Sequence, residues 1–266
     1  MMYTETMGGK DMNPVIVRNV KIGEGIPKIC VPIVGKTKEE ILEAANEILN
    51  VPADMVEWRV DFYESVFEIQ KVMGLLKELR EVLGEVPILF TFRTKNEGGE
   101  KELTYKAYAM LYKMVIESGL IDLVDVEVFS VSDICDSVIE NAHRNGVKVI
   151  GSNHDFEKTP NKEELVDRLC YMQQAGADIL KIAVMPTCEE DVLTLLGATK
   201  LMVKKYAKCP VITMSMSGIG AISRISGELF GSAITFGIVK NASAPGQMGV
   251  IELKNMLEMM HKSLSE

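Results

Sequence analysis

The sequence predicts an α/β protein folded as a (β/α)8 TIM barrel, and three observations lead to this fold class. Short apolar runs, mostly rich in Val and Ile, alternate with stretches of helical periodicity, as buried parallel strands and their crossover helices do. The alternation occurs eight times along 266 residues, which is about 30 residues per unit and suits such a barrel. The alternative is a doubly wound open sheet, but no GxGxxG or P-loop sequence follows any predicted strand.

The chain before the barrel is predicted to hold a tail and a hairpin. Residues 1–13 are expected to form a loose tail, which places a single catalytic barrel domain at residues 14–266. Val15–Val17 and Val20–Ile22 flank Arg18-Asn19, so we expect a β-hairpin that closes the barrel floor.

The eight barrel strands are predicted from apolar runs that Gly, Pro, Asn or charged residues close. They are Lys28–Val34, Met55–Phe62, Pro87–Arg93, Leu123–Phe129, Lys148–Asp155, Ala177–Met185, Val211–Met216 and Ala233–Val239.

The helices are predicted from periodicity and from signals at their ends. Thr37 suits an N-cap, and Glu40 completes a capping box with it. The stretch from His143 to Gly146 places basic residues before a glycine, which is typical of a helix C-terminus. The other helical stretches are Ser65–Leu83, Leu103–Ser118, Val131–Asn145, Asn161–Ala175, Cys188–Tyr206, Gly218–Phe230 and Gln247–Leu264.

Composition excludes several classes of function. A formal net charge of −9 argues against a nucleic-acid-binding protein. With only three histidines, a multi-histidine metal site is not expected. Five cysteines without a CxxC pair suggest reduced thiols. No signal peptide and no apolar stretch of membrane-spanning length is present, so we expect a cytoplasmic protein that does not enter a membrane.

Charged residues occupy strand positions that should face the barrel interior. Glu57, Arg59 and Asp61 share one face of their strand, while the other face is apolar and suits packing against helices. Arg93 ends the next strand, and Asp125 and Glu127 share a face of the one after. Buried charges need partners, so these residues form either a structural ion-pair network or a ligand site. We favour the ligand site, because neighbouring strands repeat the pattern.

Lys181 and His154 are the candidate reactive groups. Lys181 lies in a nearly unbroken apolar run, and desolvation lowers the pKa of a lysine from roughly 10.4, which favours a nucleophilic amine. A structural, paired or snorkelling lysine is the alternative. His154 lies near the end of the preceding strand, whereas His143 and His261 fall on helices. The pair predicts imine chemistry on a carbonyl compound, which includes aldol cleavage, elimination and isomerisation.

The last third of the chain adds a candidate ligand-binding shell. Arg224 lies in a Gly-flanked helix, and Ser243 and Gln247 belong to a polar loop that opens the final helix, a setting that suits an anionic or hydroxylated ligand. Together with Arg59 and Arg93, Arg224 would hold a carboxylate.

These stretches resemble the type I 3-dehydroquinate dehydratases from about Val15 to the end of the chain. The motifs that carry the resemblance are EWRVD (57–61), FTFR (90–93), EGGE (97–100), SNHDF (152–156), LKIAVMP (180–186), ITMSMSGIGAISR (212–224), FGSAITF (230–236) and SAPGQ (243–247). The resemblance implies a barrel, usually a homodimer, that converts 3-dehydroquinate to 3-dehydroshikimate in the shikimate pathway of aromatic amino-acid biosynthesis, without metal or cofactor.

The resemblance also implies roles for single residues. Lys181 matches the Schiff-base lysine, His154 the general acid and base, and Glu97 the acid that orients His154. The residues that match the substrate-binding shell are Glu57, Arg59, Arg93, Arg224, Ser243, Gln247, Met214 and Phe236. Pro32 departs from the pattern, since some relatives carry a serine there that can touch the substrate.

Two other functions are compatible with the same residues. A class I aldolase would use Lys181 to cleave a carbon–carbon bond, and a catalytically silent barrel would bind the ligand only. The arginine-rich pocket and the single well-placed histidine favour dehydration.

Overall fold

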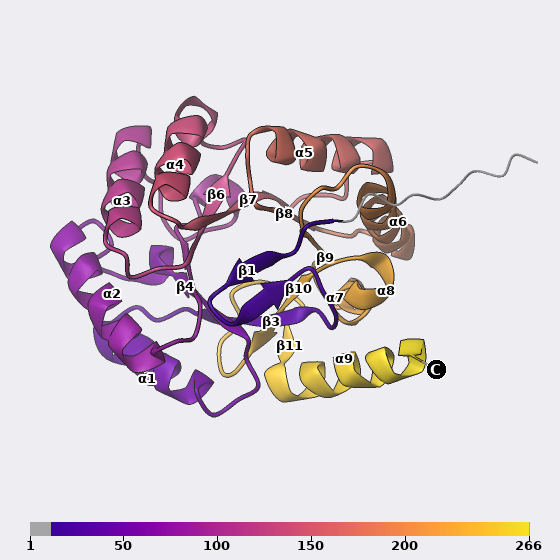
Figure 1. Cartoon of the computed structure of the whole chain (residues 1–266), viewed down its shortest axis with the longest axis horizontal. Coiled ribbons are helices and arrows are strands. Elements are labelled where there is room, and N and C mark those ends of the chain that lie inside the picture. The colour runs from indigo at the N-terminus through magenta and orange to yellow at the C-terminus, as the bar shows by residue number, and fades with distance from the viewer. Residues whose placement is uncertain (1–11, 266) are drawn as a thin grey trace, which may run out of the picture.

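A computed structural model describes residues 12–265, and this part of the chain has the predicted barrel architecture. Eight parallel strands lie at the centre and helices surround them (Figure 1). The strands are β3 (Lys28–Ile33), β4 (Met55–Arg59), β5 (Ile88–Thr91), β6 (Leu123–Glu127), β7 (Lys148–Asp155), β8 (Ile179–Val184), β9 (Val211–Ser215) and β10 (Ile234–Ile238). A two-residue strand, β11 (Met248–Gly249), lies beside β10 and was not predicted.

The helices follow the predicted order, with one exception. They are α1 (Lys38–Ile48), α2 (Ile69–Leu83), α3 (Tyr105–Glu117), α4 (Ser132–Arg144), α5 (Lys162–Gln174), α6 (Glu189–Lys205), α7 (Ala221–Ile225), α8 (Gly227–Phe230) and α9 (Val250–Ser265). The single helix expected over Gly218–Phe230 is therefore wrong. Gly220 lies so close to the end of β9 that a Cβ would be 2.1 Å from the Ser215 carbonyl oxygen. None of the helices between residues 12 and 265 is long and apolar enough to cross a membrane.

The barrel closes between β9 and β10 with fewer contacts than elsewhere. Ladders join all other neighbouring pairs from β10 through β3 to β9. At the last gap a single bridge links Val211 and Ser232, where the Ala233 N–H donates to the Val211 carbonyl at 2.8 Å. The loop after β10 thus comes directly after the strand that is only weakly paired with β9.

The barrel interior has an apolar lower half and a charged upper half. Side chains that include Cys30, Met55, Leu89 and Ile179 form a cluster inside the strands, separate from the larger core between strands and helices. Toward the C-terminal ends of the strands the buried residues become polar. They include Glu57, Arg59, Arg93, Asp125, Glu127, Ser152 and Lys181. Alternation along each strand therefore places the charges at the barrel mouth, where barrel enzymes carry their active sites.

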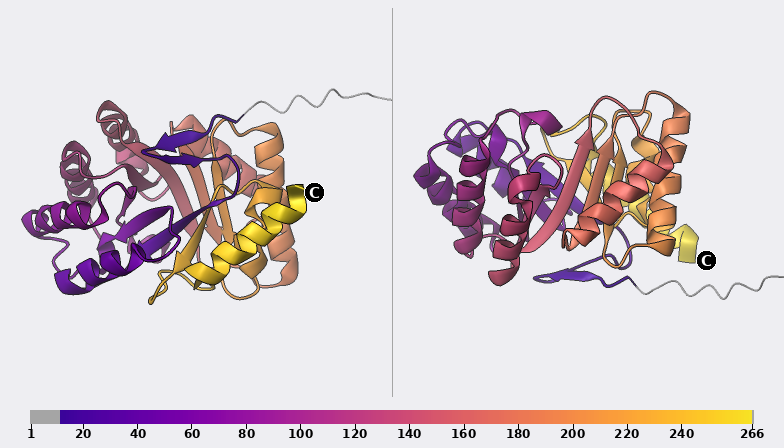
Figure 2. Two further views of the ribbon diagram at one scale, coloured as in Figure 1. Left: turned by 60° about the horizontal axis from the view of Figure 1, so that its bottom comes forward. Right: turned by 90° about the horizontal axis from the view of Figure 1, so that it is seen from above.

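The predicted hairpin is present and covers the floor. Strands β1 (Val15–Val17) and β2 (Val20–Ile22) pair antiparallel, and Figure 2 shows them across one end of the barrel. Val15, Val17 and Ile22 pack into the interior cluster. Of the expected tail at residues 1–13, the first eleven lie outside the described residues, whereas the Asn13 N–H donates to the Lys208 carbonyl at 3.2 Å.

Three aspartates at the floor of the barrel each make the same kind of hydrogen bond between neighbouring strands. Each directly precedes a strand, and its side chain accepts the backbone N–H at the start of the neighbouring strand. The bonds are Asp54 to Ile29 (2.7 Å), Asp122 to Ile88 (2.8 Å) and Asp178 to Val149 (2.9 Å). Asp122 also binds Arg18 of the hairpin turn and Arg80 of α2, both at 2.6 Å.

Candidate active site

The predicted site residues converge on one small cavity at the barrel mouth. Its lining is Glu57, Arg59, Arg93, Glu97, Gly98, His154, Phe156, Lys181, Ala183, Met214, Met216, Phe236, Ser243, Ala244 and Gln247. Every residue predicted for the site is in this set except Arg224. The cavity volume is about 40 Å³, which leaves room for only a few water molecules.

Lys181 is buried on β8 among charged and aromatic groups. Its Nζ lies 3.0 Å from Asp125 Oδ2 and 3.6 Å from Glu57 Oε1. The same nitrogen is 4.7 Å from the centre of the Phe236 ring. The apolar sequence around Lys181 therefore gave no sign of its two carboxylate partners, which lie on other strands.

His154 lies on β7, beside the lysine strand. The register pairs Ser152 with Lys181 and His154 with Ala183, so the lysine and the histidine face the same interior two residues apart. The His154 side chain is 9% exposed, and its Nδ1 lies 2.9 Å from Glu97 Oε2. Burial lowers the pKa of His154 well below its ordinary value, with further lowering from Arg93 and Lys181. The lowered pKa favours the neutral imidazole, which is the form that can accept a proton.

Glu97 reaches His154 from a short 3-10 turn, η2 (Lys95–Glu97), that follows β5. The next residue, Gly98, has φ of 82°, and a Cβ there would lie 2.3 Å from the Phe156 ring. This glycine allows the turn to approach the cavity closely. Burial, followed by the nearby Glu127 carboxylate, raises the pKa of Glu97 to about 8.

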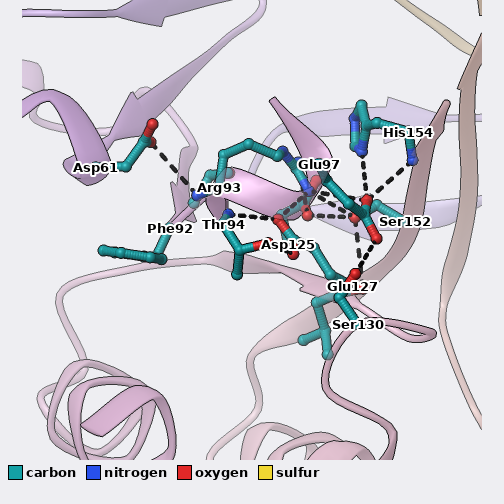
Figure 3. Close-up of polar contacts among 12 residues, drawn as sticks. Asp61, Phe92, Arg93, Thr94, Glu97, Asp125, Glu127, Ser130, Ser152 and His154 are labelled. Carbon is teal, nitrogen blue, oxygen red and sulfur yellow. Dashed lines mark hydrogen bonds and ion pairs between the residues drawn. The ribbon is translucent and has the colours of Figure 1, made fainter. Parts of the chain in front are cut away.

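Arg93 is the centre of a buried polar network (Figure 3). Its guanidinium lies 2.8 Å from Asp125, 2.9 Å from Glu127 and 3.1 Å from Ser152 Oγ. Burial opposes the ionisation of Asp125, but the Arg93 and Lys181 charges outweigh it and hold the pKa of that carboxyl well below its usual range. Arg93 already has carboxylate partners, so the ion-pair alternative describes this part of the site.

Arg59 is also paired within the protein. Its Nε and Nη2 each donate to Asp61 at 2.8 Å, and its Nη1 donates to the Ser243 carbonyl at 3.4 Å. The strand predicted over Met55–Phe62 ends at Arg59, and the 3-10 turn η1 (Val60–Phe62) turns Asp61 back toward the arginine. The sequence pattern showed the shared face but not this pairing.

Arg224, on α7, is buried without a carboxylate partner among residues 12–265. Its Nη2 donates to the Pro245 carbonyl at 2.9 Å, while Nε and Nη1 have no hydrogen-bond partner in this part of the chain. Burial lowers its pKa to about 10. Buried unpaired donors are expensive, so these two N–H groups are suited to an anionic ligand.

The loop over residues 243–247 covers the cavity and Arg224. Ser243 and Gln247 bind each other twice, through the Ser243 N–H to Gln247 Oε1 at 2.8 Å and through Gln247 Nε2 to Ser243 Oγ at 3.1 Å. Gly246 has φ of 77°, and a Cβ there would lie 2.2 Å from the Ser217 carbonyl oxygen. The loop therefore packs closely on the turn after β9. A ligand larger than a few water molecules can enter the cavity only if this loop moves.

Several residues of the site were not selected from the sequence. Asp125 showed a signal, since it shares a face with Glu127, but its contact with Lys181 depends on the barrel register. Phe156 and Met216 also line the cavity and were not among the predicted site residues. His143 on α4 and His261 on α9 lie on helices, as predicted, and pair with Asp178 and Glu228. Among residues 12–265 no group of three or more His, Cys, Asp or Glu is placed to hold a metal ion.

Comparisons with known proteins agree with this geometry. A family model described as type I 3-dehydroquinase matches residues 29–264. A 3-dehydroquinate dehydratase of Clostridioides difficile (strain 630) is 54% identical over 251 residues, which cover 94% of this chain and 98% of the relative. One of Clostridium botulinum (strain Eklund 17B / Type B) is 56% identical over 250 residues, 94% of this chain and 98% of the relative.

Solved structures give the same result. A crystal structure of the type I enzyme from Clostridium difficile with covalently modified comenic acid has a TM-score of 0.92 at 54% identity, over 95% of this chain and 99% of that one. The 3-dehydroquinate dehydratase of Geobacillus kaustophilus HTA426 has a TM-score of 0.91 at 38% identity, over 95% and 98%.

Proposed function

The chain belongs to the type I 3-dehydroquinase family and is a 3-dehydroquinate dehydratase, a hydro-lyase, and we propose that it works through an imine on Lys181 with His154 as general acid and base. The observation that carries the proposal is the placement of both side chains on adjacent strands facing one cavity. The low pKa of His154 supports its role as the base, because a neutral imidazole is needed to accept the substrate proton.

The proposed reaction balances without any further reagent. The Lys181 amine, formed by loss of one proton from its ammonium group, adds to the C3 ketone of 3-dehydroquinate; the carbinolamine takes this proton back and loses water, which gives an iminium ion. His154 removes a proton from C2, and the electron pair moves to the iminium nitrogen to form an enamine. The enamine then expels the C1 hydroxyl, which His154 protonates as it leaves as water. Hydrolysis of the imine releases 3-dehydroshikimate and restores Lys181.

The iminium ion is the electron sink for this chemistry, so we propose that no cofactor is required. One histidine serves both proton transfers because the two groups leave from the same face of the ring in a syn elimination. Glu97 is a positioning residue in this scheme, since it touches His154 and not the reacting atoms.

Arg224 is proposed to bind the substrate carboxylate. Arg59 and Arg93 are occupied by protein carboxylates, whereas Arg224 has two buried N–H groups free of hydrogen bonds within residues 12–265. When the loop over residues 243–247 moves, a carboxylate can replace the Pro245 carbonyl at Nη2 and accept at the same time from Nη1 or Nε on the planar fork. Glu57, Ser243 and Gln247 then face the hydroxyls, and Met214 and Phe236 form apolar walls.

Further proposals rest on family membership alone. They are that the reaction belongs to the shikimate pathway of aromatic amino-acid biosynthesis, that the protein acts in the cytoplasm, and that two copies form a homodimer.

The imine is tested by borohydride reduction in the presence of 3-dehydroquinate. The expected result is loss of activity together with a covalent mass increase on the peptide that contains Lys181, and neither change in Lys181→Ala. A parallel assay follows the conjugated enone absorbance of the product. His154→Ala should lose most turnover yet still be trapped. Enone formation without trapping would exclude the imine, and trapping without an enone would indicate an aldolase-type or silent barrel.

A further inference from the structure

We propose that Ser130 is a positioning residue for proton transfer, whose hydroxyl holds the Glu97 carboxylate in the ionised state that keeps His154 Nε2 available as a base. This inference rests on the proposed function of His154. It adds a residue that lies outside the cavity lining and that the sequence motifs did not single out.

The contact is short and well defined. Ser130 belongs to the turn between β6 and α4, where its N–H donates to the Glu127 carbonyl at 3.0 Å. Its Oγ lies 2.6 Å from Glu97 Oε1, and Figure 3 shows Ser130 approaching Glu97 from the side opposite His154. The turn after β6 therefore supports Glu97, which follows β5.

The other oxygen of the Glu97 carboxylate, Oε2, contacts His154. Glu97 Oε2 accepts the His154 backbone N–H at 2.9 Å and faces the ring Nδ1 at 2.9 Å. In its ionised form the Glu97 carboxylate accepts from these groups and from the serine hydroxyl, so that Nδ1 carries the proton and the Nε2 lone pair is free.

The charged groups around Glu97 act in both directions on its ionisation. The Arg93 guanidinium, 3.8 Å from Oε2, lowers the pKa of Glu97, whereas Glu127 and Asp125 repel a charge on Glu97 and favour its protonated form. Burial also raises the pKa of Glu97, and the Ser130 hydrogen bond acts in the opposite direction.

A role for Ser130 in capping α4 is not observed. A serine before a helix commonly caps it, but the N-cap of α4 is Val131 and no side chain caps this end. The hydroxyl instead donates to Glu97, which is the arrangement expected if its function concerns the carboxylate.

The experiment compares Ser130→Ala with Ser130→Thr, which keeps a hydroxyl, and with Ser137→Ala, which removes an exposed hydroxyl of α4 that binds the Ile134 carbonyl. Without the donor, Glu97 holds its proton to higher pH. The acidic limb of the kcat/KM profile should therefore move up by about half a pH unit or more in Ser130→Ala, with kcat at pH 7 about 3- to 10-fold lower. Ser130→Thr and Ser137→Ala should keep the wild-type limb.

A second readout needs no substrate. In protein labelled with 15N-histidine, His154 should be the Nδ1–H tautomer at pH 9 in the wild type and should reach that state only at higher pH in Ser130→Ala. An unchanged tautomer and an unchanged acidic limb would overturn the role of Ser130, even if kcat fell. Failure of the wild type to form the borohydride adduct would instead refute the proposed mechanism and leave the tautomer result standing.

Discussion

One oxygen of Glu97 binds His154 twice, because Oε2 lies 2.9 Å from the backbone N and 2.9 Å from the ring Nδ1 of the histidine (Figure 3). The double contact fixes both the position and the ring orientation of His154, and it directs Nε2 away from Glu97. The protonation state of Glu97 thereby decides which tautomer of the imidazole is present. An ionised Glu97 leaves Nε2 as a base, and a protonated Glu97 donates to Nδ1 and leaves Nε2 carrying the proton.

This relationship predicts the pH dependence of the enzyme. The pKa of Glu97 is raised to about 8 and that of His154 is lowered well below normal, so as the pH falls the pair gains its first proton on Glu97 near pH 8. Because that proton removes the base at Nε2, kcat/KM should rise with pH through about 8. A wild-type profile without this rise would contradict the assignment.

Glu97→Gln is the matched variant for that profile. The amide can still accept from Nδ1 but does not titrate, so the acidic limb should move to lower pH, where His154 itself is protonated. At pH 8 we expect kcat to fall about 10-fold or less, since the positioning is weakened and the chemical groups remain.

The sequence predicted the fold well because each strand carries its own periodic signal. β7 was predicted with its observed bounds, Lys148–Asp155, and the two hairpin strands likewise. The break between α7 and α8 was missed because it depends on how closely Gly220 approaches β9. Such a contact between segments does not change the hydrophobic periodicity of the sequence, from which the helices were predicted.

The site was predicted less completely, for a similar reason. Alternation along single strands pointed to charged side chains at the mouth, including Arg93 and Lys181. It did not show which carboxylate each would face, since that depends on register between strands. Asp125 contacts both Lys181 and Arg93 from β6, and only the assembled barrel places it there.

Arg224→Met should separate stability from binding. Removing a buried guanidinium whose Nε and Nη1 have no partner among residues 12–265 should raise the free energy of unfolding by about 1–3 kcal/mol. The same change removes the proposed carboxylate partner, so KM for 3-dehydroquinate should rise about 100-fold. Urea unfolding and steady-state kinetics measure the two effects, and Arg144→Ala on the surface of α4 is the control. A less stable variant with normal KM would contradict both expectations.

Gly246→Ala tests whether the loop over residues 243–247 must pack closely on Ser217 for substrate binding. A Cβ at this position would lie 2.2 Å from the Ser217 carbonyl oxygen, and φ is 77°, so the alanine disfavours the closed loop. KM should rise about 10-fold or more, while borohydride trapping at saturating substrate still modifies Lys181. Gly218→Ala, on the neighbouring turn with open space around its Cβ position, should behave as the wild type. Equal kinetics for the two variants would show that closure does not need this close approach.

Asp122 is predicted to matter for stability and not for catalysis, because it lies at the floor of the barrel. Its carboxylate accepts the Ile88 N–H and pairs with Arg18 and Arg80. Asp122→Ala leaves a backbone donor and two cations without this partner, so the free energy of unfolding should fall by about 3 kcal/mol. Asp122→Asn can still accept the N–H and should lose about half as much.

The buried Trp58, the only tryptophan in the chain, reports unfolding by its fluorescence. Lys21→Ala, on the exposed side of the hairpin, is the control and should change stability by less than about 0.5 kcal/mol. At temperatures where all variants are folded, kcat/KM should equal that of the wild type, since hairpin and mouth lie at opposite ends of the strands. A loss of activity without a loss of stability in Asp122→Ala would show that the floor influences the site.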